Sequence, residues 1–462
     1  MKKSNLKKYI FLLLGVILVG ALLVIGLMKN DELNQSVSVP MVRTESMYVI
    51  FALAFLLLLA VVFLTIVVFK NNLKKNDAET RLEVASNELE KPEEKKDKKK
   101  PDSGERFFML TKTDREQALK KPVEFDKTVT LSSFCERFRN FSASKLGLYY
   151  DIEDIRKFVA SLAVTKIVVM QGMSGTGKTS LAFALGEFLQ NPSTIVPVQP
   201  MWKERTDLIG YYNEFTKKFN ETTLLQKLYE ANYSEEIFVT VLDEMNIARV
   251  EYYFAEFLSL LEIPTEEGRY LDVVSDVWKD DPKLLKGGKI KLPSNMWFIG
   301  TANNDDSTFA ISDKVYDRAM VMNLDKKANA FFAEETSGIK LSYKTFIKLV
   351  DRAKKEFSIS QRNLRRISKL DKYLVKTLKI TFGNRIMKQL RDYIAVFIAC
   401  GGRELEAIDD ILCKKVLRKL EAKNPVLVKN NAEGLKDTLT ELFGENEMLS
   451  CKEYLTHLEQ NA

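Results

Sequence analysis

The sequence predicts an α/β protein in which a parallel sheet flanked by helices is followed by a helical lid and preceded by a two-helix transmembrane hairpin. Three observations support this fold class. The apolar run KIVVMQG (166–172) passes through a glycine-rich turn into the amphipathic segment SLAFALGEFL (180–189), as a buried parallel strand passes into a helix. A second apolar run, IFVTVLDEMN (237–246), ends in two carboxylates. Two long uncharged apolar runs lie before all of these.

The two N-terminal apolar runs cover residues 9–28 and 47–69 and contain no charged side chain. A bilayer core about 30 Å thick is spanned by about 20 helical residues, so each run is long enough to cross it. Neither run carries an ionisable residue that would mark a transport pathway, and we therefore expect an anchor. A cleaved signal peptide is the alternative for the first run, but its apolar stretch is too long and no small-x-small cleavage site follows it.

Lysines flank the predicted hairpin at both ends. They are Lys2, Lys3, Lys7 and Lys8 before the first run and Lys70, Lys74 and Lys75 after the second. By the positive-inside rule both ends are cytoplasmic. We expect the protein in a bacterial cytoplasmic membrane, with both termini and the globular part in the cytoplasm. Because much of the net charge of +7 lies in these flanks, it is weak evidence for a nucleic-acid partner.

The chain divides into five predicted parts. Residues 1–69 form the anchor, and residues 70–106, rich in charge and proline, form a flexible linker. Residues 107–330 carry the strand-and-helix pattern of a base domain. Residues 331–430 show the helical spacing of a lid, and residues 431–462 form a helical tail.

The cysteines and the histidine exclude two classes of site. Cys135, Cys400, Cys413 and Cys451 show neither CxxC pairing nor metal-ligand spacing, and the single histidine is His457. A zinc site or a histidine-based catalytic triad is hard to build from this set. We interpret the thiols as reduced side chains of a cytosolic domain.

The glycine-rich turn GMSGTGKT (172–179) matches the complete pattern G-x-x-x-x-G-K-[ST]. Glycines let backbone N–H groups close around phosphate oxygens, and the N-terminus of the following helix adds positive potential. The pattern predicts that Lys178 reaches the β- and γ-phosphates of a nucleotide and that the Thr179 hydroxyl binds Mg²⁺. The predicted nucleotide-binding residues are Gly172, Ser174, Gly175, Thr176, Gly177, Lys178, Thr179 and Ser180.

The carboxylates of Asp243 and Glu244 follow a run of β-forming apolar residues. A magnesium-dependent NTPase requires carboxylates at the C-terminal end of such a strand. We predict that Asp243 holds Mg²⁺ through water and that Glu244 orients and deprotonates the attacking water. Such a pair is common at plain surface turns, but its position downstream of the glycine-rich turn strengthens the catalytic interpretation.

Two further polar residues lie next to the remaining apolar runs, one after a run and one before a run. The run NMWFIGT (295–301) leads to Asn303, whose amide is placed to reach the γ-phosphate and the attacking water. Arg318 directly precedes another apolar strand. An arginine in that place can stabilise the charge of the transition state, worth about 10³–10⁵ in rate. The alternative for Arg318 is an ordinary surface ion pair with Asp313 or Asp317.

The ordered set of P-loop, carboxylate pair, asparagine and arginine, followed by a helical region, resembles an AAA+ ATPase over about residues 107–430. Within that superfamily the chain most resembles the McrB branch, with the MoxR branch nearby. The motifs that carry this resemblance are VLDEMN (241–246), GTANNDD (300–306) and DRA (317–319).

The resemblance implies several features beyond the motifs themselves. Residues 269–295 resemble a hairpin inserted before the asparagine strand, and FGNRIMKQL (382–390) resembles a lid helix whose Arg385 is a second γ-phosphate contact. A homo-oligomeric, hexameric ring is implied, because an arginine finger normally completes a neighbour's site. A separate effector, such as a nuclease subunit, is implied as well, since the sequence contains no nuclease constellation of its own.

One departure from the McrB branch bears on the nucleotide. GTP-hydrolysing McrB subunits resemble one another around N-T-A-D-R-S, whereas this chain has Asn303-Asn304-Asp305-Asp306-Ser307-Thr308. Asn303 and Asp306 are kept, but Ser307 replaces the arginine. We therefore expect ATP as the substrate with Mg²⁺ as the cofactor, and GTP stays open.

Residues 197–219 are aromatic and basic and match an insertion that faces the substrate in related branches. Trp202, Lys203, Arg205, Tyr211 and Tyr212 are candidates to grip a nucleic acid or a peptide. The alternative is that this segment simply packs onto the core through Trp202, Leu208, Ile209 and Tyr212.

Three functions fit this sequence to different degrees. The first is a membrane-anchored NTPase that remodels or translocates a partner protein or nucleic acid. The second is a nucleotide-binding membrane scaffold or sensor with negligible hydrolysis. The intact Lys178, Asp243, Glu244 and Arg318 argue against it, because a pure scaffold would not need the general base. The third, an ABC transporter subunit, is disfavoured because no LSGGQ-like signature precedes the carboxylate strand.

Overall fold

The computed structural model describes residues 105–303 and 308–460, which belong to one compact unit. The predicted anchor and almost all of the predicted linker lie outside the described residues. Among the helices that are described, none is both long and apolar enough to cross a bilayer.

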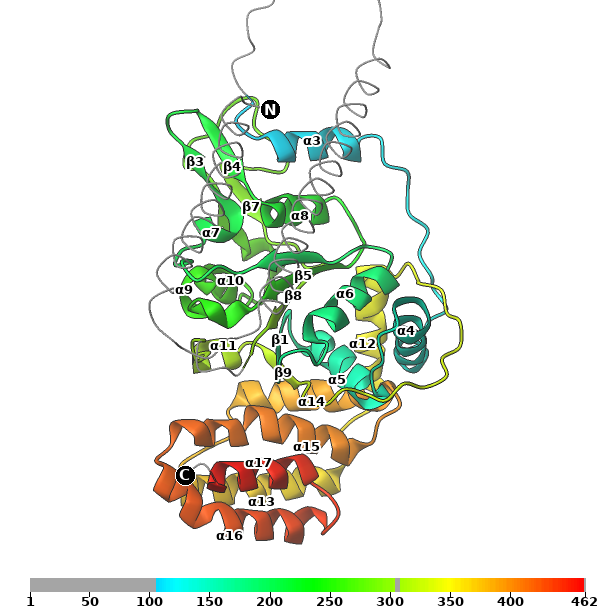
Figure 1. Cartoon of the computed structure of the whole chain (residues 1–462), viewed down its shortest axis with the longest axis vertical. Helices are drawn as coiled ribbons and strands as arrows, with labels where there is room; N and C mark the ends of the chain where they lie inside the picture. The colour runs from blue at the N-terminus through cyan, green and yellow to red at the C-terminus, as the bar shows by residue number, and fades with distance from the viewer. Residues whose placement is uncertain (1–104, 304–307, 461–462) are drawn as a thin grey trace, which may run out of the picture. The chain divides into compact units, whose positions relative to one another are not determined.

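A five-stranded sheet forms the centre of the base domain, with the strand order β2-β5-β8-β1-β9 (Figure 1). The strands are β1 (Ile167–Gln171), β2 (Thr194–Pro197), β5 (Phe238–Asp243), β8 (Met296–Thr301) and β9 (Met320–Asn323). Every neighbouring pair is parallel. Because parallel strands need crossover connections, the chain leaves the sheet after each strand and returns through helices or loops. All carboxyl ends therefore meet at one edge, where the predicted polar residues lie.

Apolar residues alternate between two cores along the strands. On β1, Val168 and Met170 belong to one core and Ile167 and Val169 to the other. A sheet that is covered on both faces requires this arrangement, which explains why the strands read as continuous apolar runs. The predicted parallel sheet flanked by helices is confirmed.

Different helices cover the two faces of the sheet. The core that contains Val168 is shared with α4 (Leu131–Leu146), α5 (Ile152–Val164), α6 (Lys178–Phe188) and α12 (Tyr343–Glu356). The core that contains Ile167 is shared with α3 (Phe108–Gln117), α7 (Thr206–Ile209), α8 (Thr223–Ala231), α9 (Val250–Tyr253), α10 (Ala255–Leu260) and α11 (Asp313–Tyr316). Both cores are rich in aromatic rings; the Phe254 and Phe257 rings, for example, stack with centroids 4.9 Å apart.

Two antiparallel hairpins project from the second face. One pairs β3 (Gly210–Asn213) with β4 (Lys218–Glu221), and the other pairs β6 (Tyr270–Asp272) with β7 (Lys289–Lys291). The hairpin expected within residues 269–295 is thus present. The start of the described chain is attached to both, because Arg106 pairs with Asp281 and the Glu221 carboxylate accepts the N–H groups that open α3. Arg106 is only 4% exposed, so its assignment to the flexible linker was wrong.

The helical region extends through the C-terminal part of the described chain. It contains α13 (Gln361–Leu378), α14 (Asn384–Ala399), α15 (Glu404–Lys415), α16 (Pro425–Phe443) and α17 (Leu449–Gln460). These helices pack side by side in Figure 1 and share one core, which includes Leu435 and Leu455. The predicted boundary between lid and tail, at residues 430 and 431, falls inside α16. Pro425 does not break the helix there, because it lies in the first turn, where its missing N–H is not needed.

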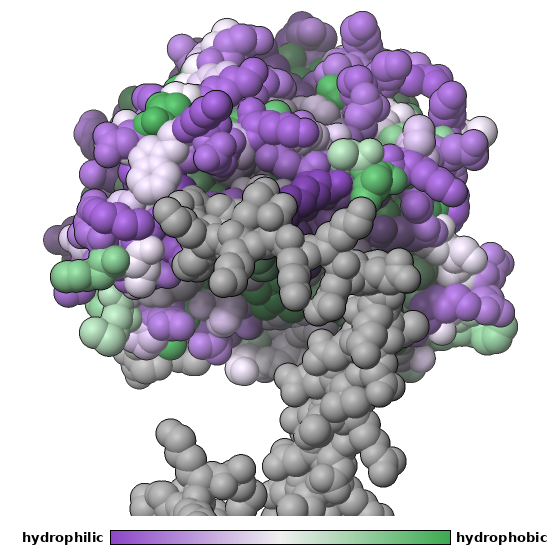
Figure 2. Space-filling model, turned by 90° about the horizontal axis from the view of Figure 1, so that it is seen from above, coloured by the Kyte–Doolittle hydropathy of each residue, from purple (hydrophilic) through white to green (hydrophobic). Residues whose placement is uncertain are grey.

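The visible surface in Figure 2 is mainly hydrophilic, with hydrophobic residues scattered among polar ones. Scattered exposed apolar side chains are normal for a folded protein and do not indicate a binding patch.

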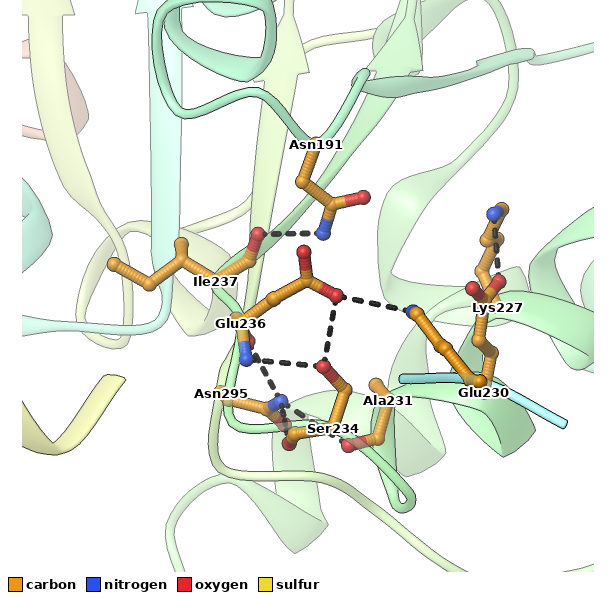
Figure 3. Close-up of polar contacts among 9 residues, drawn as sticks. Asn191, Lys227, Glu230, Ala231, Ser234, Glu236, Ile237 and Asn295 are labelled. Carbon is orange, nitrogen blue, oxygen red and sulfur yellow. Dashed lines mark hydrogen bonds and ion pairs between the residues drawn. The ribbon is translucent and has the colours of Figure 1, made fainter. Parts of the chain in front are cut away.

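A buried amide organises the turn that leads into β5. The side-chain amide of Asn295 donates to the carbonyl oxygens of Ala231, Ser234 and Glu236 at 2.8–3.1 Å (Figure 3). The Asn191 amide donates to the Ile237 carbonyl, 2.9 Å away, on the other side of the same turn. Together these contacts bind backbone oxygens of the connection between α8 and β5, at the end of the sheet opposite the predicted site.

Replacing Asn295 should therefore destabilise the base domain. We expect Asn295→Ala to lower the free energy of unfolding by about 2 kcal/mol, because three carbonyl oxygens lose the hydrogen bonds that this buried amide donates. Chemical denaturation measures this, with Asn220→Ala on the exposed face of β4 as the control. Equal unfolding free energies for the two variants would contradict the assignment.

Candidate nucleotide site

The P-loop joins β1 to α6 through a turn that only glycines can form. Gly172, Gly175 and Gly177 have φ values of 138°, 77° and 95°, in the region that side chains disfavour. A Cβ on Gly172 would lie 2.3 Å from the Leu324 carbonyl oxygen, so no larger residue fits there. This turn brings the backbone round so that α6 begins at Lys178, with Gly177 as its N-cap.

The Lys178 ammonium is buried and folds back over its own loop. Its Nζ donates to the carbonyl oxygens of Gly172 and Met173, at 2.9 and 2.7 Å. The other end of the loop is held by Tyr150, whose hydroxyl donates to the Gly177 carbonyl at 3.0 Å. Burial raises the pKa of Tyr150, so its proton stays in place for this contact. Tyr150 has no motif around it, and sequence reasoning missed it.

One carboxylate oxygen of Asp243 connects the P-loop helix to the next strand. The hydroxyls of Thr179 and Thr301 both donate to Asp243 Oδ1, at 2.7 and 2.8 Å. The backbone N–H of Glu244 donates to the Thr301 hydroxyl at 2.9 Å. Thr301 is only 3% exposed and thus orients both acidic residues. It was missed as a site residue, although its position at the end of a central strand was a usable signal.

The backbone of Glu244 adopts the left-handed conformation, with φ 53° and ψ 47°. A non-glycine residue in this conformation costs about 1–3 kcal/mol, and such strain is concentrated at functional sites. The turn ends β5 and leaves the Glu244 side chain exposed beside the half-buried Asp243. Two consecutive carboxylates therefore differ in surroundings, as their predicted roles require.

A cavity of about 200 Å³ lies where these elements meet. Its lining residues are Ser174, Gly175, Gly177, Lys178, Thr179, Ser180, Asp243, Glu244, Thr301 and Asn303. Eight of the ten are predicted nucleotide or catalytic residues at the same edge of the sheet, and a ninth, Asp243, is the predicted metal ligand. Gly172 and Thr176 belong to the loop without lining the cavity; the Thr176 hydroxyl donates to the Met173 carbonyl at 3.0 Å.

Asn246 anchors the segment that carries Asn303. Its amide donates to the Asn303 carbonyl oxygen at 2.9 Å and to the Thr308 hydroxyl at 3.0 Å. These contacts hold the residues on either side of 304–307. Residues 304–307, which include the Asp306 and Ser307 compared with McrB, lie outside the described residues. Asn246 is the last residue of the motif VLDEMN (241–246), but the sequence did not predict a role for it.

Arg318 and Arg385 are not part of this cavity. Both guanidinium groups bind the same carboxylate, that of Glu262, with Nη2–oxygen distances of 2.7 and 2.5 Å. Arg318 therefore forms an ion pair, but with Glu262 and not with the Asp313 or Asp317 that we considered. Arg385 pairs with Glu262 and does not line the cavity of its own chain, where the γ-phosphate contact implied by the resemblance would lie. The Arg318 Nε is buried and has no hydrogen-bond partner among the described residues.

The oxygen donors in the cavity suit Mg²⁺. Thr179 offers a hydroxyl and Asp243 a carboxylate, and their oxygens are 2.7 Å apart. Hard oxygen ligands from one or two side chains, with the remaining positions left to water and phosphate, are typical of magnesium in nucleotide sites. The residues present therefore fit the ion.

Comparisons with known proteins agree with this geometry. Residues 167–319 match the family model described as the AAA domain of the dynein-related subfamily. The match covers the sheet from β1 to the residue before β9, with the complete cavity. Residues 167–319 therefore form an AAA domain, and such a domain indicates a P-loop NTPase.

Two solved structures are distantly similar. A proposed ATPase from Cytophaga hutchinsonii has a TM-score of 0.45 and 13% identity, over 74% of this chain and 99% of its own. A full-length MCM homologue from Methanopyrus kandleri has a TM-score of 0.35 and 12% identity, over 63% and 61%. No curated protein matches the sequence. The class assignment rests on the domain match and the site geometry.

The Thr301 hydroxyl should matter for turnover rather than for nucleotide binding. We expect Thr301→Val to lower the rate of hydrolysis about tenfold, because it removes one hydrogen bond to each acidic residue. Steady-state hydrolysis and equilibrium nucleotide binding measure the two effects separately. Thr240→Val is the matched control, since Thr240 is also buried, in β5, and its hydroxyl donates to the Met296 sulfur at 3.6 Å rather than to an acidic residue. Equal turnover in the two variants would refute this role.

Proposed function

We propose that this protein is a membrane-anchored AAA+ NTPase of the McrB-like branch, which hydrolyses ATP in an oligomeric ring to remodel or translocate a partner protein or nucleic acid. The observation that carries the proposal is the convergence of Lys178, Asp243, Glu244 and Asn303 on one cavity. A binding module alone would need the lysine but not the exposed carboxylate opposite it.

Each side chain has a distinct task in hydrolysis. The Lys178 ammonium exchanges its contacts with two loop carbonyls for phosphate oxygens, since both are oxygen acceptors. Glu244 accepts the proton of the attacking water, and Asn303 orients that water by hydrogen bonding. A positioned general base contributes about 10²–10⁴ in rate. Thr179 and Asp243 would hold Mg²⁺, which supplies positive charge against the phosphate oxygens.

The ring is supported by the two arginines outside the cavity. Arg318 lies on the α11–β9 turn beside Arg385 of the lid, and both are paired with Glu262 rather than with the P-loop of their own chain. The buried Nε of Arg318 without a partner leaves one donor unused within the described residues. Both arginines would complete the cavity of a neighbouring copy, as an arginine finger does. A closed ring, for which we propose six copies, gives every copy such a neighbour.

The nucleotide preference and the branch rest on sequence. The arginine of the GTP-hydrolysing McrB pattern is replaced by Ser307, which supports ATP. The McrB-like assignment is supported by VLDEMN (241–246), GTANNDD (300–306) and the two inserted hairpins, β3–β4 and β6–β7. A separate effector, such as a nuclease subunit, would use the work of the ring.

The β3–β4 hairpin is the surface we propose for the polymer. Phe215 at its tip is 99% exposed and Tyr211 is 54% exposed. Lys217 ends the same turn and Lys218 begins β4. Aromatic and cationic groups together suit either an extended peptide or a nucleic acid. Of the candidates proposed from sequence, the aromatic Trp202 and Tyr212 instead pack inward, against Tyr253 and Trp278, and Arg205 pairs with Glu256.

The membrane attachment is a proposal from sequence. Residues 9–28 and 47–69 would place the protein in a bacterial cytoplasmic membrane, with both termini and the AAA+ domain in the cytoplasm. We expect deletion of residues 1–69 to move the protein from the membrane fraction to the supernatant after ultracentrifugation. Deletion of the C-terminal residues 461–462 is the control, and recovery of both truncated proteins in the membrane fraction would contradict the anchor.

A nucleotide-binding scaffold or sensor with negligible hydrolysis is the second candidate. Glu244→Gln separates the two, because it removes the proton acceptor while keeping the shape of the side chain. We expect turnover of ATP by the full chain to fall by about 10²–10⁴ with binding retained, and GTP to be hydrolysed more slowly than ATP. Glu453→Gln, exposed on α17, is the control. Wild-type protein that binds ATP but does not turn it over would favour the scaffold.

A further inference from the structure

The turn that carries Arg318 is held by the lid. Lys415, the last residue of α15, is 6% exposed, and its Nζ donates to the carbonyl oxygens of Tyr316 and Ala319. The distance to Tyr316 is 2.7 Å. These two carbonyls lie on either side of Arg318, so the ammonium fixes the backbone from which the guanidinium projects.

Tyr316 connects the same turn to two further parts of the chain. The guanidinium of Arg418, which follows α15, lies over its ring. Its hydroxyl accepts a hydrogen bond from the side chain of Gln171, the last residue of β1, which directly precedes Gly172 of the P-loop. Direct contacts therefore join this turn both to the strand before the P-loop and to the lid.

Burial of an ammonium group at this place is costly. Loss of hydration lowers the pKa of Lys415 to about 7, against the opposing effect of Asp317, while Arg418, Arg385 and Lys419 add to the lowering. A well-packed apolar side chain would fill the same space without that cost. Unlike an apolar side chain, Lys415 donates hydrogen bonds to two carbonyls of the base domain, those of Tyr316 and Ala319. Its contribution is therefore to position that turn rather than to fill space.

We propose that Lys415 is a positioning residue for the arginine finger, because it fixes the 316–319 turn so that Arg318 points at the nucleotide of a neighbouring copy. Tyr316 and Gln171 link that turn to the P-loop of its own chain. The inference rests on the proposed function, because it requires that Arg318 act in a neighbouring site. The proposal gives the lid a second role, the positioning of Arg318, in addition to carrying Arg385.

The variant that tests this is Lys415→Met in the full chain, which keeps the length of the side chain and removes the ammonium. We expect ATP turnover to fall at least tenfold, while nucleotide binding and the thermal midpoint stay close to those of the unmodified protein. Lys414→Met is the matched control, because this neighbouring lysine pairs with Asp410 instead of the 316–319 turn. Equal losses in both variants would overturn the inference.

Mixing experiments distinguish a positioning role from a general defect. Lys415→Met chains keep intact cavities, so Glu244→Gln chains, which keep working arginines, should restore turnover when the two are mixed. Arg318→Ala chains should not restore it, since both partners then lack a correctly placed finger. Restoration by Arg318→Ala, or none by Glu244→Gln, would overturn the proposal for Lys415.

A third mixture tests the underlying function by itself. Arg318→Ala with Glu244→Gln must recover turnover if fingers act between copies, and failure here would refute the ring mechanism and with it the role of Lys415. Recovery here, together with no recovery for Lys415→Met with Glu244→Gln, would refute the role of Lys415 alone. If Lys415→Met does not fold, Tyr316→Phe takes its place in the same mixtures. This variant removes only the hydroxyl that binds Gln171, and we expect a smaller loss with the same pattern of recovery; unchanged turnover would overturn the link to the P-loop.

Discussion

The site depends on one oxygen atom, Oδ1 of Asp243, which accepts hydrogen bonds from Thr179 and Thr301. These three residues come from the first turn of α6 and from the ends of the two central strands β5 and β8. Because the strands are parallel and adjacent, their carboxyl ends reach the same place, and the short side chains close the remaining distance. The P-loop is thereby held against the carboxylate strand, and the cavity lies between them.

The arrangement separates charges that would otherwise interfere. The carboxylates and Lys178 line the cavity, whereas Arg318 and Arg385 both pair with Glu262 outside it. A chain alone thus holds a lysine but no guanidinium in its own cavity. This arrangement fits the proposed ring, in which each copy would contribute the acid and lysine of one site and the arginines of the next.

Sequence patterns predicted the parallel sheet, the P-loop, the carboxylate pair and the position of Asn303, because these features are local: each depends on a run of apolar residues and on the few residues directly after it. They did not predict Tyr150, Thr301 or Lys415, whose contacts join residues far apart in the chain and which have no motif around them. Nor did they predict that Arg385 lies beside Arg318, since the packing of α14 on the base domain decides this. The boundary between lid and tail was misplaced, since the single helix α16 runs across it from Pro425 to Phe443.

The central claim is that the cavity binds a nucleotide through Lys178 together with Mg²⁺. Equilibrium binding of a fluorescent ATP analogue to the full chain, with Mg²⁺ or with a chelator, tests this most directly. We predict that Lys178→Ala and removal of Mg²⁺ each weaken binding at least tenfold, about 1.4 kcal/mol. Binding that is unaffected by both changes would contradict the account, because the nucleotide would then lie elsewhere.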